Sequence, residues 1–124
     1  MESTQKQMPS DKIKVKIGPN EYTIDFPNNA QLIDIEASRI RMTGGTVKDM
    51  IQGNTAAMSA YITVEAIATF EILVPKLKTD LNCKSLLNLN PQQSQSFLKA
   101  YEKYYEWMDQ WRVFLNQDIE EKKS

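Results

Sequence analysis

Few side chains in this sequence are of a type that could carry out catalysis or hold a metal. The chain of 124 residues contains one cysteine, Cys83, and no histidine. Histidine is the usual general base, the usual activator of a cysteine nucleophile and a frequent metal ligand. Without histidine, Cys83 is expected to be a free structural thiol, and a zinc site built from cysteine and histidine is excluded by count.

The acidic residues and the glycines show no spacing that is typical of a catalytic site. Asp34 and Glu36 project from different sides of the helix expected around them, and Glu102 and Glu106 fall on a solvated helix face. The Thr-Gly-Gly-Thr run at residues 43–46 lacks the Lys-Ser/Thr ending of a phosphate loop, so it is expected to end a helix. We therefore expect a protein that is not an enzyme and uses no cofactor or metal.

The aromatic side chains offer a different chemistry, which is adhesion to another apolar surface. Seven of the eleven aromatic residues fall between positions 97 and 114. On a helix, one stripe roughly 80 degrees wide contains Phe97, Tyr101, Tyr104, Met108, Trp111, Leu115 and Ile119. Trp107 and Phe114 widen the stripe on one flank and Leu98 and Tyr105 widen it on the other, to about 200 degrees against ~100 degrees for a typical surface helix.

This excess width has two interpretations, and the sequence leaves both open. In the first, the helix is buried on two sides, between a central helix and a hairpin. In the second, the spare aromatic surface binds a partner protein, because Tyr and Trp are enriched in interfaces. The candidate partner-binding residues are Trp107, Trp111, Phe114, Tyr104 and Tyr105.

The elements that position these residues begin with a β-hairpin. Residues 1–11 are polar and are expected to form a flexible arm. Apolar and polar residues then alternate over 12–17 and again over 22–26, around a Gly-Pro-Asn turn at 18–20. A lone hairpin is marginal in water, so its apolar face must lie on helices, on further strands or on another copy of the chain.

The polar face of the first strand carries Lys12, Lys14 and Lys16. These lysines have three interpretations. They discourage edge-to-edge aggregation, they face an acidic partner, or they touch nucleic-acid phosphates. The balanced net charge of −1 argues against the third, so nucleic acid is an unlikely partner.

Helices are expected to make up the rest of the chain. Asn28 or Asn29 can cap a helix that runs to about Met42, and a short helix is expected at 46–52. A long helix from about Thr55 is apolar on nearly all sides, which is typical of the buried centre of a domain. The last helix begins at the cap that Asn90 and Pro91 provide and is expected to reach about Gln117.

These elements predict an α+β, mostly α fold, in which an N-terminal β-hairpin packs on a bundle of about three to four helices. A single domain is expected over residues 12–119, followed by a frayed tail at 120–124. The hydrophobic content of 41% and charged content of 25% are typical of globular proteins. The apolar segment 56–74 is interrupted by Glu65 and Glu71, so it falls short of a transmembrane span, and a soluble cytoplasmic protein is expected.

The order of elements resembles a known family. A polar arm leads to a hairpin that ends in Tyr-Thr-Ile-Asp-Phe-Pro at 22–27, then to a helix closed by Met-Thr-Gly-Gly at 42–45 and a helical remainder. This order is similar to that of small tail-morphogenesis proteins of tailed bacteriophages, of the tail assembly chaperone type. The resemblance implies a non-enzymatic protein of the host bacterial cytoplasm that coats the tape-measure protein and helps to recruit tail-tube subunits.

The strongly aromatic last helix departs from the pattern of that family. It leaves open a second role, a structural virion subunit of a tail, ring or connector. In that role the hairpin extends the sheet of a neighbouring subunit by strand addition. Both roles imply protein partners, with a homo-oligomer among the options, and neither involves a membrane.

Overall fold

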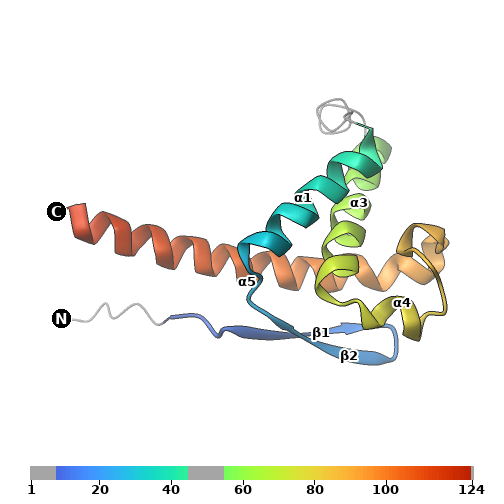
Figure 1. The fold of residues 1–124 in the computed structure, drawn as a ribbon, viewed down its shortest axis with the longest axis horizontal. Coiled ribbons are helices and arrows are strands. Elements are labelled where there is room, and N and C mark those ends of the chain that lie inside the picture. Colours follow the sequence, from blue (N-terminus) through green and yellow to red (C-terminus); the bar gives the residue numbers. More distant parts are fainter. Residues whose placement is uncertain (1–7, 45–54, 124) are drawn as a thin grey trace.

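The hairpin and the helices follow one another in the predicted order in a computed structural model, which describes residues 8–44 and 55–123. The elements are β1 (Lys12–Ile17), β2 (Asn20–Asp25), α1 (Asn29–Thr43), α3 (Thr55–Leu73), α4 (Lys76–Asp80), the 3₁₀ turn η1 (Leu86–Asn88) and α5 (Pro91–Lys123) (Figure 1). The predicted fold class, α+β and mostly α, is confirmed. The short helix expected at 46–52 lies outside the described residues.

The two strands pair in antiparallel register and bury one face on α5. Ile13 lies opposite Ile24 and Val15 opposite Tyr22 in the register. Val15 and Ile24 are almost fully buried, and β1 packs against α5. Each such side chain contributes roughly 1.5–3 kcal/mol when buried, as an upper bound. Of the three covers that the sequence left open for the hairpin, the structure therefore uses a helix.

Helix α1 is set by local sequence at both of its ends. The Asn28 side chain accepts a hydrogen bond from the Gln31 backbone N–H at 2.8 Å, and the Gln31 side chain accepts one from the Asn28 N–H at 3.0 Å. This reciprocal capping box identifies Asn28 as the cap. At the other end Gly44 takes a left-handed conformation that closes the helix.

The expectation that α3 is buried along its whole length is only half correct. Residues 66–70 are buried, whereas Ile62, about one turn earlier, is 42% exposed. The reason is visible in Figure 1, where α3 rises away from α5 and the hairpin with α1 as its companion. Only the lower half of the helix therefore lies at the junction of the other elements.

The core lies where the hairpin, the lower half of α3, the α4–η1 segment and α5 meet. Its buried residues are Val15, Ile17, Tyr22, Ile24, Ala66, Ile67, Phe70, Val74, Leu77, Leu86, Phe97, Ala100, Tyr104 and Trp107. Phe70 and Phe97 meet edge to face, with ring centroids 6.2 Å apart. Between the two long helices, Leu77 and Leu86 are completely buried.

The two glutamates that interrupt the apolar helix α3 tie it to its neighbours. The Tyr101 hydroxyl of α5 donates a hydrogen bond of 2.7 Å to the Glu65 carboxylate. The Glu71 carboxylate accepts hydrogen bonds from the Leu86 N–H at 2.6 Å and from the Ser85 hydroxyl at 3.0 Å. Both charges are therefore used to join elements that are distant in sequence.

Replacement of Glu71 by alanine should lower the free energy of unfolding by about 1–3 kcal/mol, because the N–H of the buried Leu86 then loses its acceptor. Chemical denaturation measures the loss. Glu102→Ala, at an exposed position of α5, is the matched control and should change stability by less than about 0.5 kcal/mol. Equal effects of the two substitutions would contradict the anchoring role of Glu71.

Candidate functional site

The C-terminal half of α5 extends beyond the rest of the domain. The helix has 33 residues, which corresponds to a length of about 50 Å. Figure 1 shows its C-terminal half passing the hairpin and the other helices. We refer to residues 111–117 as the α5 extension. Within it Val113 is 40% exposed and Leu115 is 46% exposed.

The structure divides the five candidate partner-binding residues among three environments. Tyr104 and Trp107 are each only 5% exposed and belong to the core. Tyr105 is 59% exposed, and Trp111 and Phe114 are half-buried. The first interpretation, burial between helix and hairpin, therefore describes Tyr104 and Trp107, and both are absent from the surface that a partner would meet. A partner-binding role rests on the other three residues and stays a prediction.

Edge-to-face contacts join the buried and half-buried rings into one cluster. The Phe26 ring lies 5.6 Å from that of Trp107 and 4.9 Å from that of Trp111, at interplanar angles of 68° and 63°. Trp111 in turn meets Phe114 at 5.8 Å and 86°. This T-shaped geometry is one of the two arrangements that aromatic pairs favour. Phe26, at the end of the hairpin, thus contacts the extension through Trp111.

A single backbone carbonyl holds both indoles. The Ser10 oxygen accepts a hydrogen bond from Nε1 of Trp107 at 2.7 Å and another from Nε1 of Trp111 at 2.9 Å. A carbonyl oxygen has two lone pairs, so it can satisfy both donors. The sequence predicts a flexible arm over residues 1–11, of which 1–7 lie outside the described residues. Ser10, in contrast, is tied to α5.

An open hollow lies between residues 8–10 and α5. Met8, Ser10, Val113 and Phe114 are among the residues that line this open space of about 520 Å³. Met8 is 64% exposed. On the helix, the exposed Val113 and Leu115 lie about 100 degrees to either side of Phe114. The site is therefore an adhesive surface and not an enclosed pocket.

No cluster of metal-binding side chains is seen in the parts of the chain that the structure describes. Within residues 8–44 and 55–123, no group of three or more His, Cys, Asp or Glu side chains is placed to hold a metal ion. Cys83 is a half-buried free thiol, and Glu36 pairs with Arg39 on its own helix. None of the helices described is both long and apolar enough to cross a membrane.

Comparisons of the chain with protein-family models, with curated proteins and with solved structures found no match. The resemblance to tail assembly chaperones therefore rests on the sequence pattern alone. The shared Ser10 carbonyl and the Phe26 contacts could not be predicted from the sequence. A backbone acceptor that lies 97 and 101 residues away from its two indole donors has no sequence signature.

Replacement of Trp107 by alanine should lower the free energy of unfolding by about 3–5 kcal/mol, because it empties a core position and removes one indole donor. Tyr105→Ala, two residues earlier on an exposed face, should cost less than about 1 kcal/mol. Urea titrations followed by circular dichroism measure both values. A loss for Trp107 as small as that for Tyr105 would contradict the core assignment.

The buried tyrosines should make stability fall at high pH. Burial raises the pKa of the Tyr104 phenol to about 12, whereas an unfolded tyrosine has a pKa of about 10. The folded state therefore keeps its proton between these values while the unfolded state loses it. The resulting stabilisation is complete below pH 10 and disappears as the pH rises through 12.

Tyr104→Phe should lessen this alkaline loss, because the substituted ring has no proton to titrate. The measurement is the free energy of unfolding of both proteins at about pH 8 and about pH 11, within the window set by the two pKa values. Part of the loss remains in the variant, since burial also raises the pKa of Tyr61 to about 12. Identical alkaline losses in the two proteins would refute the contribution of Tyr104.

Proposed function

We propose that this chain is a non-enzymatic assembly protein that binds a partner protein through the α5 extension. One observation carries the proposal: α5 continues past the core, and Val113 and Leu115 on it stay exposed. An aromatic cluster with exposed apolar neighbours is the usual composition of the centre of a protein interface. Trp111 and Phe114 are the anchor residues in this proposal, and the exposed Tyr105 lies on the opposite flank of the stripe.

The fixed geometry of the cluster favours binding. Trp111 is held by its hydrogen bond to Ser10 and by its contacts with Phe26 and Phe114 before any partner arrives. Side chains that are already ordered lose little conformational entropy on association, so more of the contact energy contributes to affinity. The extended helix suits a partner that is itself an apolar helix lying along it.

The partner that we propose is the tape-measure protein of a tailed bacteriophage, with a tail-tube subunit as the second candidate. This choice follows from the sequence resemblance, in which such proteins coat the apolar tape-measure chain in the host cytoplasm. The exposed apolar side chains of the extension support a role in covering an apolar helix.

A second candidate function is that of a structural virion subunit that assembles by strand addition. The observation that favours it is that the described residues form a sheet of only two strands, β1 and β2. The outer edge of each strand has no strand partner among these residues, and such an edge can pair with a neighbouring chain. Presence of the protein in purified mature virions at fixed stoichiometry would favour this role over that of a chaperone.

Co-expression with a tagged tape-measure protein tests the chaperone role. The double substitution Phe114→Ser and Leu115→Ser should reduce recovery of the complex about tenfold or more, because it removes two apolar contacts from the proposed interface. Ile33→Ser, at a 67% exposed position on α1, is the matched control and should leave recovery unchanged.

The recoveries can be compared only if the unfolding temperatures of both variants stay close to that of the original chain. Equal recovery with the two variants would refute the extension as the binding surface. Failure of the unsubstituted chain to bind any helical tail protein would refute the chaperone role itself.

A further inference from the structure

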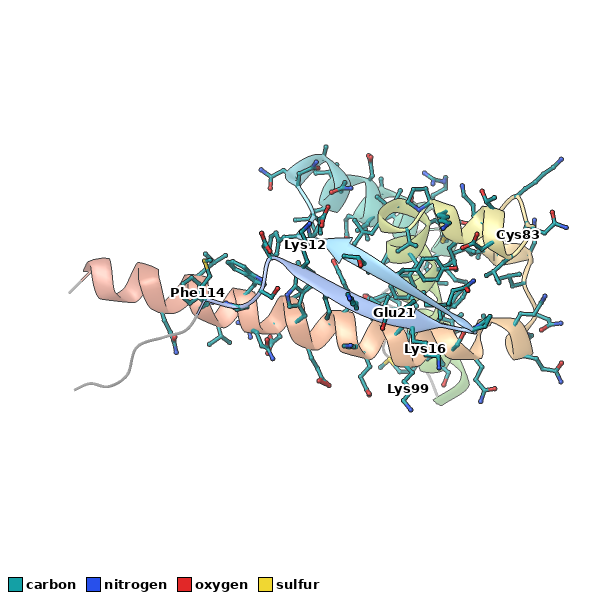
Figure 2. The ribbon with its side chains drawn as sticks, turned by 90° about the horizontal axis from the view of Figure 1, so that it is seen from below. Lys12, Lys16, Glu21, Cys83, Lys99 and Phe114 are labelled. Atoms are coloured by element: carbon teal, nitrogen blue, oxygen red, sulfur yellow. The ribbon has the colours of Figure 1, made fainter. Side chains whose placement is uncertain are left out.

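A second surface, near the turn of the hairpin, concentrates positive charge. Lys16 and Gly18 at the end of β1 and Ser96, Lys99, Ala100 and Lys103 on α5 line a hollow of about 350 Å³. Figure 2 shows Lys16 and Lys99 side by side at this face, whereas Phe114 lies far along α5. The 15 residues of helix between Lys99 and Phe114 separate the two surfaces by about 20 Å.

The three lysines of this hollow have no ion-pair partner among the described residues. Elsewhere the chain does pair its cations, as Lys12 with Asp25 at 3.5 Å and Arg112 with Asp109 at 2.7 Å. Glu21 faces Lys16 across the sheet without forming an ion pair. Glu102 and Glu106, which neighbour Lys99 and Lys103 on α5, also form none with them.

The two lysines of α5 that line the hollow repel each other. Lys99 and Lys103 are four residues apart on one helix face, and like charges at this spacing destabilise a helix. Lys16 then adds a third positive charge from the strand packed against the same helix. An anion in the hollow would relieve this repulsion.

Two uncharged features complete the hollow. The half-buried Ser96 hydroxyl has no hydrogen-bond partner among the described residues, so it can donate to a ligand. Gly18 has a positive φ of 62°, and a Cβ built on it would meet no atom within 4 Å. The turn therefore leaves open space next to the ammonium groups.

We propose that this hollow binds a phosphate group. A phosphate carries up to two negative charges and several acceptor oxygens, so it can engage three lysines and a hydroxyl together. A lone carboxylate would neutralise only one of the three lysines. The ligand is either a small phosphate compound or the backbone of a nucleic acid, which share this chemistry. The concentration of charge is local, since the whole chain has a net charge of −1.

Isothermal titration with inorganic pyrophosphate at low ionic strength tests the site. The full chain should bind pyrophosphate saturably at one site. The double variant Lys99→Gln, Lys103→Gln should have a dissociation constant at least about tenfold higher. The variant Lys76→Gln, Lys84→Gln removes the same charge from exposed positions outside the hollow and should bind as the original chain does. The double variant Phe114→Ser, Leu115→Ser should also bind pyrophosphate as the original chain does. Failure of the phosphate site can thus be told apart from failure of the proposed function.

Absence of saturable binding would overturn the proposal. Equal weakening by the two double lysine variants would overturn it as well, because it would reveal attraction by net charge alone. Tighter binding of an acidic peptide than of pyrophosphate would overturn the assignment to phosphate.

A single-stranded oligonucleotide distinguishes the two sources of phosphate, and either result supports the site. If three lysines contact a backbone, the slope of log affinity against log salt is about −2, and it becomes shallower in Lys99→Gln, Lys103→Gln. Binding of the oligonucleotide no tighter than that of pyrophosphate assigns the site to a small phosphate compound.

Discussion

The docking of the hairpin on α5 is the contact on which the remaining structure depends. Two strands alone do not form a stable sheet in water, so the inner face of β1 and β2 must be covered by something else. In this protein Val15, Ile17 and Ile24 lie against a helix that begins more than sixty residues later. Because the hairpin occupies that face of α5, Tyr104 and Trp107 become core residues and are not available to a partner.

The boundary between core and surface falls within one continuous apolar stripe of α5. Up to Trp107 the stripe is covered by the hairpin and α3, and beyond Trp111 the domain offers little to cover it. Phe26 and the Ser10 carbonyl mark this boundary, since they hold Trp107 on the buried side and Trp111 on the open side. The same interactions that complete the core therefore also order the surface that we propose for binding.

The surface chemistry of α5 differs between its two ends. Its first turns carry Lys99 and Lys103 beside Lys16 of the hairpin, whereas its last described side chains are mostly apolar or uncharged. A helix that leaves the domain in this way can engage a charged ligand near the hairpin turn and an apolar one beyond the core. The two proposals rest on different residues, so each can fail without the other.

Local sequence determined the elements of this protein, because caps, turns and periodicity act over a few residues. The capping box at Asn28, the closure at Gly44 and the alternation around Gly18 required nothing distant in the chain. Tertiary structure alone decided which side of α5 became core, that Ser10 would serve two indoles, and that Lys16 would join Lys99. The spacing of aromatic residues reports how wide an apolar arc is, but which part of that arc is covered depends on where distant elements dock.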